Sequence, residues 1–436
     1  MVWSMALRRA DGRTSGGSRL LRVSSWRLTA CLVLTAVAVA GCASLPFHRA
    51  MTEEQSEMAR IPGYPQNVRF WGDDLPEDIV EIIRERYDQV AKRLEANGDN
   101  APDLDPPAAN MLALSGGADD GAYGAGLLVG WSEAGDRPQF ELVSGVSTGA
   151  LIAPFAFLGS DYDAELERVY TTLSSDQIFL TSVFDALSGI ISGASLADTR
   201  PLRNQIERQL TQDVLDAIGE EHRRGRRLLV GTTNLEAQRP VIWNIGAIAA
   251  SGRPDRLRLF HDVILASASI PGVFPPVVIR VDSQGDRFSE IHVDGGVTRQ
   301  VFLYPTQLNR GIMQEAGAFR ETRRLWVIRN TRVLPQYQKL EPNFFSLSGR
   351  SVSSLIKSQG TGDIFRLYVL ARRDGLDFNL AFVPDEFDAA SQELFDPVYM
   401  RALFDLGYQR ARNGYPWKKR PPGIPDGSEP QPASLN

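Results

Sequence analysis

Residues 140–158 read FELVSGVSTGALIAPFAFL, in which a Gly-x-Ser-x-Gly joins two apolar runs without a break. This pattern predicts a buried strand, a sharp turn and a buried helix. A serine hydroxyl becomes a usable nucleophile where a tight turn lifts it clear, and such a turn leaves no room for flanking side chains. Gly145 and Gly149 meet that need around Ser147, and the following helix would direct its N–H groups at developing negative charge. Ser147 is therefore the candidate nucleophile, with a chance match in a chain rich in Gly and Ser as the alternative.

A glycine-rich segment lies upstream of this serine. Residues 111–114 predict a short buried strand, and residues 115–128 follow it as SGGADDGAYGAGLL. A glycine-rich turn between a strand and a helix presents backbone N–H groups to an anion. A phosphate-binding P-loop would need Gly-Lys-Ser/Thr at its end, and a dinucleotide fingerprint would need a glycine where Val129 stands. The remaining anion is the oxyanion of an acyl-transfer intermediate, and a turn that only allows close helix–strand packing is the alternative.

A serine nucleophile needs a proton acceptor. The Ser–Asp–His order of α/β-hydrolases would place a histidine near the C-terminus, but none follows His292, which itself stays open as a partner. Residues 291–297 read IHVDGGV, an alternating strand that ends at Asp294, followed by Gly295 and Gly296. Strand ends are the usual place for catalytic groups in open α/β sheets, and desolvation raises a carboxyl pKa toward that of a useful base. Asp294 is therefore the candidate base, although Asp-Gly-Gly alone is more often a plain turn.

The N-terminal region has the composition of an export signal. Six arginines precede residues 28–41, which carry no charge, so residues 1–41 are interpreted as a signal peptide. Residues 39–42 read VAGC and resemble the bacterial lipobox, in which Cys42 would receive a diacylglyceryl group and become the first mature residue. An ordinary signal peptide or an N-terminal membrane helix is the alternative, and a later start at Met5 stays open. Ala43 is not the aspartate that tends to retain lipoproteins on the inner membrane. We therefore expect a lipid anchor in the cell envelope and, in a Gram-negative source, at the outer membrane facing the periplasm.

Composition limits the partners that the chain can take. With 47 basic and 53 acidic residues, it lacks the positive footprint of a nucleic-acid binder. Cys31 would leave with the signal and Cys42 would be acylated, so no thiol remains for a disulfide or a metal. No His/Cys ligand cluster is present, and neither a metal nor another cofactor is expected.

The remaining sequence divides into three parts. Residues 42–107 predict a tether and a helical lead-in, 108–415 the main domain, and 416–436 a Pro/Ser-rich disordered tail. Within the main domain we expect the following elements: strands at 227–234, 324–330 and 378–383, and helices at 353–373 and 397–412. The apolar stretch 178–191 predicts either core packing or a lid over an acyl chain.

Taken together, these motifs resemble the patatin-like phospholipase family. Its glycine-rich loop, Gly-x-Ser-x-Gly and Asp-Gly-Gly occur here in order, and residues 266–276 (ASASIPGVFPP) match a further family stretch. The resemblance is clear over residues 112–310 and implies a three-layer α/β sandwich with a mainly parallel central sheet and helices on both faces. It also implies a Ser–Asp dyad acyl hydrolase with the following roles: Ser147 as nucleophile, Asp294 as proton acceptor, and the backbone N–H groups of Gly116, Gly117 and Ala118 as the oxyanion hole.

The glycine-rich loop departs from the family pattern at two positions. The family usually has a third glycine where Ala118 stands and an Arg or Lys where Asp120 stands. Backbone donors survive an alanine if its φ is negative, whereas Asp120 removes favourable charge near the oxyanion or a lipid phosphate. The sequence thus predicts a membrane-anchored hydrolase of acyl lipids or phospholipids. A catalytically silent lipid-binding protein on the same fold is the alternative.

Overall fold

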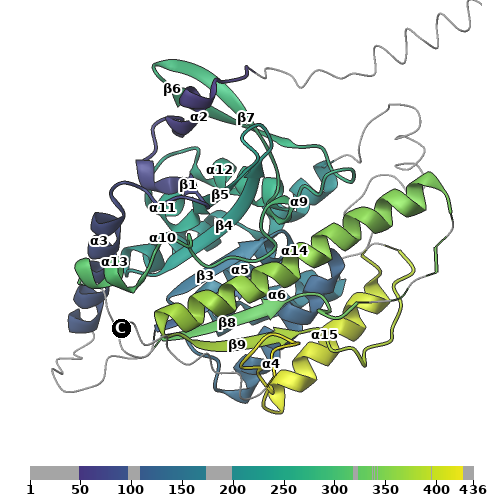
Figure 1. The fold of residues 1–436 in the computed structure, drawn as a ribbon. Coiled ribbons are helices and arrows are strands. Elements are labelled where there is room, and N and C mark those ends of the chain that lie inside the picture. The colour runs from purple at the N-terminus through teal and green to yellow at the C-terminus, as the bar shows by residue number, and fades with distance from the viewer. Residues whose placement is uncertain are drawn as a thin grey trace, which may run out of the picture.

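The apolar strands of the chain assemble into one nine-stranded sheet (Figure 1). The structure is a computed structural model, and it describes residues 49–96, 109–172, 199–317, 323–335, 337, 339–340, 342–393 and 395–425. The strands are β1 (Arg69–Trp71), β2 (Ala109–Leu114), β3 (Leu142–Val146), β4 (Arg227–Asn234), β5 (Arg239–Asn244), β6 (Val277–Ser283), β7 (Asp286–Asp294), β8 (Arg323–Arg329) and β9 (Asp377–Phe382). The helices are α2 (Glu53–Glu57), α3 (Ile79–Ala96), α4 (Gly121–Ala134), α5 (Thr148–Leu158), α6 (Asp163–Thr172), α9 (Arg200–Gln209), α10 (Gln212–Arg223), α11 (Ile245–Ala250), α12 (Arg256–Ser267), α13 (Arg310–Glu315), α14 (Phe344–Asp374) and α15 (Pro397–Arg412).

The centre of the sheet is parallel. Its order is β1-β5-β4-β3-β2-β8-β9, and the run from β4 to β9 consists of parallel pairs only. β5 is antiparallel to β4, and β1 is antiparallel to β5 at the edge. In such a sheet the carboxyl ends of the central strands lie along one edge, which is where ligands bind in open α/β folds.

The strand β4 changes partner halfway along its length. Its first part pairs with β3 as far as Gly231, which lies opposite Val146, and its last part pairs with antiparallel β7, where Thr232 lies opposite Asp294. β7 therefore occupies the place beside β4 that β3 has just left. This junction brings the carboxyl ends of β3 and β7 together.

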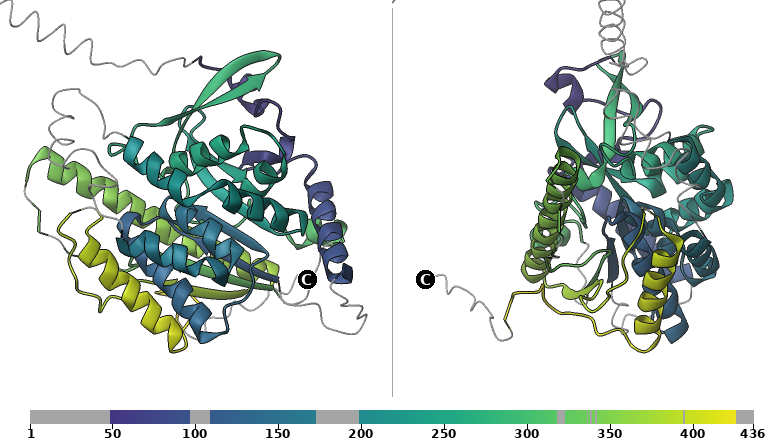
Figure 2. Two further views of the ribbon diagram at one scale, coloured as in Figure 1. Left: turned by 180° about the vertical axis from the view of Figure 1, so that it is seen from behind. Right: turned by 90° about the vertical axis from the view of Figure 1, so that its right-hand side faces the viewer.

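Helices cover both faces of the sheet. Strand alternation directs Leu112 and Val143 into a core formed with α4, α5, α10, α12 and α15, and Ala113 and Leu142 into a second core with α14. Seen from the side, α14 lies on one face and α15 on the other (Figure 2). The predicted three-layer α/β sandwich with a mainly parallel central sheet is confirmed.

The helices α4 and α15 pack backbone to backbone. A Cβ at Gly126 would lie 2.0 Å from the Phe404 carbonyl oxygen, and one at Gly130 would lie 2.2 Å from that of Tyr408. The later glycines of the glycine-rich segment thus serve helix packing, whereas Gly116 and Gly117 belong to the loop itself. This contact is between two helices, so it differs from the helix–strand packing that the sequence left open as the alternative for this segment.

Most elements expected from the sequence are present, with α14 starting at Phe344 rather than at residue 353. The predicted boundaries of the main domain are too narrow at both ends. In the lead-in, β1 is an edge strand of the sheet itself. In the tail, Lys418 exchanges backbone hydrogen bonds with Leu380, and Trp417 packs on Trp131, so disorder is a wrong prediction for residues 416–425. Both additions depend on pairing with distant segments, which local composition does not encode.

Several predictions fall on residues outside the described ranges. These are the signal peptide 1–41 with Cys42, the linker at 97–107, the apolar stretch 178–191 and the last part of the tail, residues 426–436. Within the described ranges, no helix combines the length and the apolar character that crossing a bilayer requires.

Candidate active site

Ser147 lies on the predicted sharp turn between β3 and α5. Its backbone has φ 55° and ψ −125°, a strained conformation for a residue with a side chain. The two glycines explain how the turn closes: a Cβ at Gly145 would lie 2.3 Å from the Gly149 carbonyl oxygen, and one at Gly149 would lie 2.5 Å from that of Leu114. Strand, turn and helix therefore pass each other at backbone contact, and the serine is held at the carboxyl edge of the sheet.

A second serine supports this turn. Ser267, at the end of α12, accepts a hydrogen bond from the Ser147 backbone N–H at 3.0 Å and donates one to the Gly231 carbonyl at 2.7 Å. Ser267 is fully buried, so both bonds form away from water. It belongs to the ASASIPGVFPP stretch, which the sequence identified without assigning a role to this hydroxyl.

We expect Ser267→Ala to weaken both the turn and the fold. Because it leaves the Ser147 N–H and the Gly231 carbonyl buried without this partner, unfolding free energy should fall by about 1–3 kcal/mol. Turnover by the folded protein should fall as well, since the strained turn loses a restraint. Chemical denaturation and kcat would measure the two effects, and Ser269→Ala is the matched control: Ser269 is equally buried, but its hydroxyl bonds within its own chain segment, to Leu265. Equal kcat in the two variants would contradict a role for Ser267 at the turn.

Asp294 is the other group at the β3–β7 junction. It is 5% exposed, and its Oδ1 accepts a hydrogen bond from the Gly296 N–H at 2.7 Å. Its backbone is anchored as well, because its N–H donates to the Ser269 carbonyl at 2.9 Å and its carbonyl accepts from the Thr233 hydroxyl at 3.0 Å. Burial raises the pKa of Asp294 to about 6, although hydrogen bonds from the Ser147 side chain and the Gly296 N–H act to lower it. The fold thus brings together the two side chains that the sequence singled out and gives the carboxyl the pKa of a usable base.

His292, the other candidate base, is engaged elsewhere. Its Nδ1 lies 2.9 Å from the Thr232 hydroxyl and its Nε2 lies 2.9 Å from Glu290, so both ring nitrogens have partners. Glu290 is fully buried and also bonds the Arg69 guanidinium at 2.9 Å. Burial acts to raise the pKa of Glu290, but the Arg69 charge and the His292 bond hold it at about 2. His292 therefore belongs to a structural polar cluster and does not present a free nitrogen to Ser147.

The loop that follows β2 supplies backbone donors beside Ser147. Gly116 already uses its N–H, which donates to the Gln300 carbonyl at 3.0 Å. The N–H groups of Gly117 and Ala118 have no acceptor among the described residues, so these two are the donors open to an oxyanion. The prediction that Ala118 keeps its backbone donor assumed a negative φ, but the φ of Ala118 is 49°. The alanine adopts a left-handed conformation that glycine takes at lower cost.

Asp120 stands where the resemblance predicts an Arg or Lys, and its surroundings explain how this carboxyl is tolerated. Its Oδ1 accepts a hydrogen bond from the Tyr399 hydroxyl of α15 at 2.6 Å. Removal from water raises its pKa to about 7, against that hydrogen bond and the charges of Arg329 and Arg332. Arg329, at the end of β8, is 2% exposed and reaches Gln300, the residue that holds Gly116. A buried cation therefore enters the site from a distant strand, which no local pattern reveals.

An apolar cavity of about 60 Å³, partly open to solvent, begins at Ser147. Ala118 and Thr148 line its polar end beside the serine. Its other walls come from apolar side chains of α5, α6, α9, α15 and residues 268–274: Leu151, Phe155, Val169, Leu202, Ile206, Ile270, Phe274 and Met400. Such a cavity fits a hydrocarbon chain whose carbonyl end reaches the serine. Among the described residues, no cluster of three or more His, Cys, Asp or Glu is arranged to hold a metal ion.

Comparison with known proteins identifies a family domain over the residues that form this site. Residues 112–305 match the family model described as "Patatin-like phospholipase", so this part of the chain is a patatin-like phospholipase domain. The comparison with curated proteins yields no match. Among solved structures, VipD from Legionella pneumophila is 13% identical, with 71% of this chain and 67% of that chain covered and a TM-score of 0.33. Human GIVD cytosolic phospholipase A2 is 12% identical, with 73% of this chain but only 55% of that chain covered and a TM-score of 0.30.

Proposed function

We propose that this domain hydrolyses carboxylic ester bonds of acyl lipids or phospholipids through a Ser147–Asp294 dyad. The observation that carries the proposal is the buried Asp294 carboxyl, hydrogen-bonded by the Ser147 side chain and with a pKa of about 6. A base of that pKa is largely ionised at neutral pH and still accepts a proton in the transition state. The apolar cavity that starts at Ser147 supplies a place for the acyl chain.

The geometry supports the following sequence of steps. Asp294 takes the proton of Ser147, whose oxygen attacks the ester carbonyl and forms a tetrahedral oxyanion. The N–H groups of Gly117 and Ala118 stabilise that charge without reorganisation, because the loop already holds them in place. The protonated Asp294 then gives its proton to the leaving alcohol, and the same carboxylate activates the water that releases the fatty acid.

The pH dependence should follow from the raised pKa of Asp294. The dyad needs the ionised carboxylate, so kcat/KM should fall below about pH 6, where the folded protein holds Asp294 protonated. The acid limb should persist in Asp120→Asn, because that carboxyl is bonded to Tyr399 rather than to the serine. Stopped assays with an uncharged ester over pH 4–9 would measure it, and a flat profile would contradict Asp294 as base.

The first test is single-turnover fatty-acid release from a mixed lipid extract, combined with fluorophosphonate labelling mapped by peptide mass spectrometry. We expect release, a label on Ser147 and neither in Ser147→Ala, with activity unchanged by EDTA. The released products would distinguish phospholipase, lysophospholipase and simple esterase activity. Absence of both fatty-acid release and labelling in the folded protein would favour the alternative of a catalytically silent lipid-binding protein. The strained backbone of Ala118 and the acidic side chain of Asp120 are the two features that support this alternative.

We also propose that the chain is anchored in the cell envelope by acylated Cys42, at the outer membrane facing the periplasm. The proposal rests on the uncharged run 28–41 and the VAGC at 39–42. An anchored domain would meet its lipid substrate at the membrane surface. Metabolic labelling with a fatty-acid analogue and membrane fractionation of Cys42→Ser would test it, and an unlabelled wild-type chain would contradict it.

A further inference from the structure

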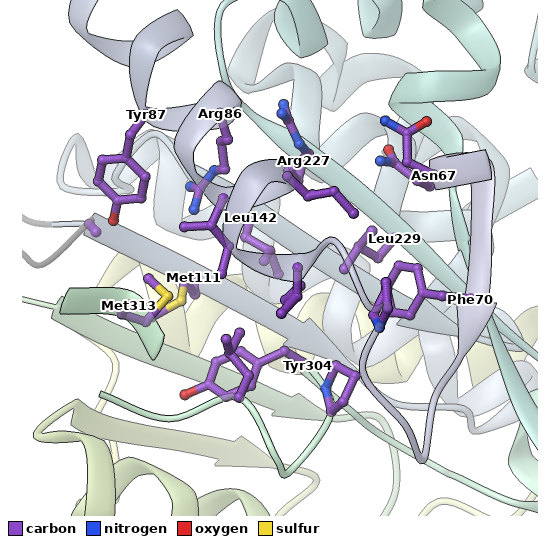
Figure 3. Close-up of a pocket in the computed structure, with 18 of the residues that line it drawn as sticks. Asn67, Phe70, Arg86, Tyr87, Met111, Leu142, Arg227, Leu229, Tyr304 and Met313 are labelled. Carbon is purple, nitrogen blue, oxygen red and sulfur yellow. The ribbon is translucent and has the colours of Figure 1, made fainter. Parts of the chain in front are cut away.

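A second apolar cavity lies at the opposite edge of the sheet from Ser147. The amino-terminal ends of β2, β3 and β4 supply Met111, Leu142 and Leu229 to one side of it. The helix α3 contributes Tyr87 from another side, and α13 contributes Met313 (Figure 3). Its volume is about 140 Å³, which is larger than the roughly 60 Å³ of the cavity at Ser147.

This cavity is separate from the active site. No residue lines both, and Leu142 and Ser147 lie five residues apart on the same extended segment, about 16 Å along the strand. Protein interiors otherwise pack almost as densely as organic crystals and leave few voids. An apolar space of this size is comparable to apolar cavities that hold a small apolar molecule.

The mouth of the cavity has a distinct chemistry. Asn67, Phe70, Pro76 and Ile82 line both the apolar cavity and a neighbouring polar hollow, so the two spaces adjoin. The Oδ1 atom of Asn67 is buried at this junction and has no hydrogen-bond partner among the described residues. A buried acceptor without a donor is unfavourable, and a ligand that donates a hydroxyl there would satisfy it.

The charge of the hollow narrows the choice of ligand. The following charged side chains line it: Glu57, Asp74, Glu77 and Asp78, against Arg60 and Arg69. Arg69 is paired with the buried Glu290 and Glu57 with Arg239, so Asp74, Glu77 and Asp78 against Arg60 leave the hollow negative. The arginines that line the apolar cavity itself are engaged: Arg86 with Glu141, Arg227 with Gln89, and Arg323 with the Asp374 carbonyl. At the mouth, the negative surface disfavours the carboxylate of a free fatty acid and accepts a neutral or zwitterionic head group with a free hydroxyl.

We propose that this second apolar cavity is a non-catalytic site for a monoacyl glycerolipid. The single acyl chain lies among Met111, Leu142 and Met313, and the free glycerol hydroxyl donates to Asn67. The choice of a lipid rests on the proposed acyl hydrolase function, whereas the existence of the site does not.

The test uses the full chain carrying Ser147→Ala. The probes are 1-O-hexadecylglycerol and ether-linked lysophosphatidylcholine, because no esterase cleaves their ether bonds. Both are equilibrated with the protein below their critical micelle concentrations. Titration calorimetry would give affinity and stoichiometry. Met313→Trp fills the second cavity and Leu202→Trp, as the matched control, fills the one at Ser147. We expect affinity for the second site to fall at least tenfold in Met313→Trp and to be unchanged in Leu202→Trp. Ile79→Trp, a change in α3 rather than α13, should repeat the result of Met313→Trp.

The hydroxyl contact is tested separately with Asn67→Leu. Its affinity for hexadecylglycerol should fall by about three- to tenfold, while affinity for the analogue lacking the 2-hydroxyl should not change. Unaltered binding in folded Met313→Trp and Ile79→Trp, loss only in Leu202→Trp, or no saturable binding to the Ser147→Ala protein would overturn the site. Tighter binding of palmitate than of hexadecylglycerol would overturn the ligand class. Loss of ester hydrolysis in the wild type with binding retained would count against the proposed function alone.

Discussion

Asp294→Asn should reduce kcat by about 10³-fold or more and leave the protein folded. The asparagine has the same shape and its Oδ1 still accepts the Gly296 N–H, but its amide cannot take a proton from Ser147. Burial disfavours the charged form of Asp294, whose folded pKa of about 6 lies above its unfolded value. Ionisation therefore lowers stability as the pH rises through 6, and the neutral variant should melt at the same temperature or higher at pH 8. Burst kinetics with an activated ester and thermal melts would measure both effects.

The matched control for this substitution is His292→Gln. His292 bonds Thr232 and Glu290, so replacing it should lower the melting temperature. The folded fraction should keep kcat within about threefold, because neither ring nitrogen serves Ser147. If His292→Gln lost turnover and Asp294→Asn kept it, the assignment of the base would be wrong.

Gly149→Ala should lower the unfolding free energy by about 3 kcal/mol and abolish turnover in what remains folded. The new Cβ would meet the Leu114 and Ser115 carbonyl oxygens at 2.5 and 2.7 Å, and both belong to backbone that cannot move without displacing the oxyanion loop. β2 is held on both sides by β3 and β8, so the strain has no cheap outlet. Urea denaturation and single-turnover release would measure the two losses.

A glycine in open space provides the contrast. Gly362, exposed in α14, has nothing within 4 Å of its would-be Cβ, so Gly362→Ala should raise stability by about 0.5–1 kcal/mol without affecting turnover. Equal stability losses in the two variants would contradict the close contact at Gly149 as the cause of its loss.

Local chemistry explains why the sequence predicted so much of this site. A strand, a tight turn and a helix depend on residues adjacent in the chain, so the two glycines around Ser147 identify the turn directly. The Asp-Gly-Gly at 294–296 similarly identifies a strand end. Because these steric requirements involve only neighbouring residues, the sequence alone predicts both the turn and the strand end.

The tertiary structure decided what depends on distant segments. Only pairing across β4 brings Asp294 to Ser147, and only packing places Ser267 under the turn and Arg329 beside Gln300. It also engages the Gly116 N–H and so narrows the predicted oxyanion donors to two of the three. By itself, the sequence determined the candidate nucleophile, the candidate base and the α/β class, because local sterics and periodicity encode them. The partners of those residues, the true limits of the domain and both cavities were decided in three dimensions, because long-range contacts leave no local pattern in the chain.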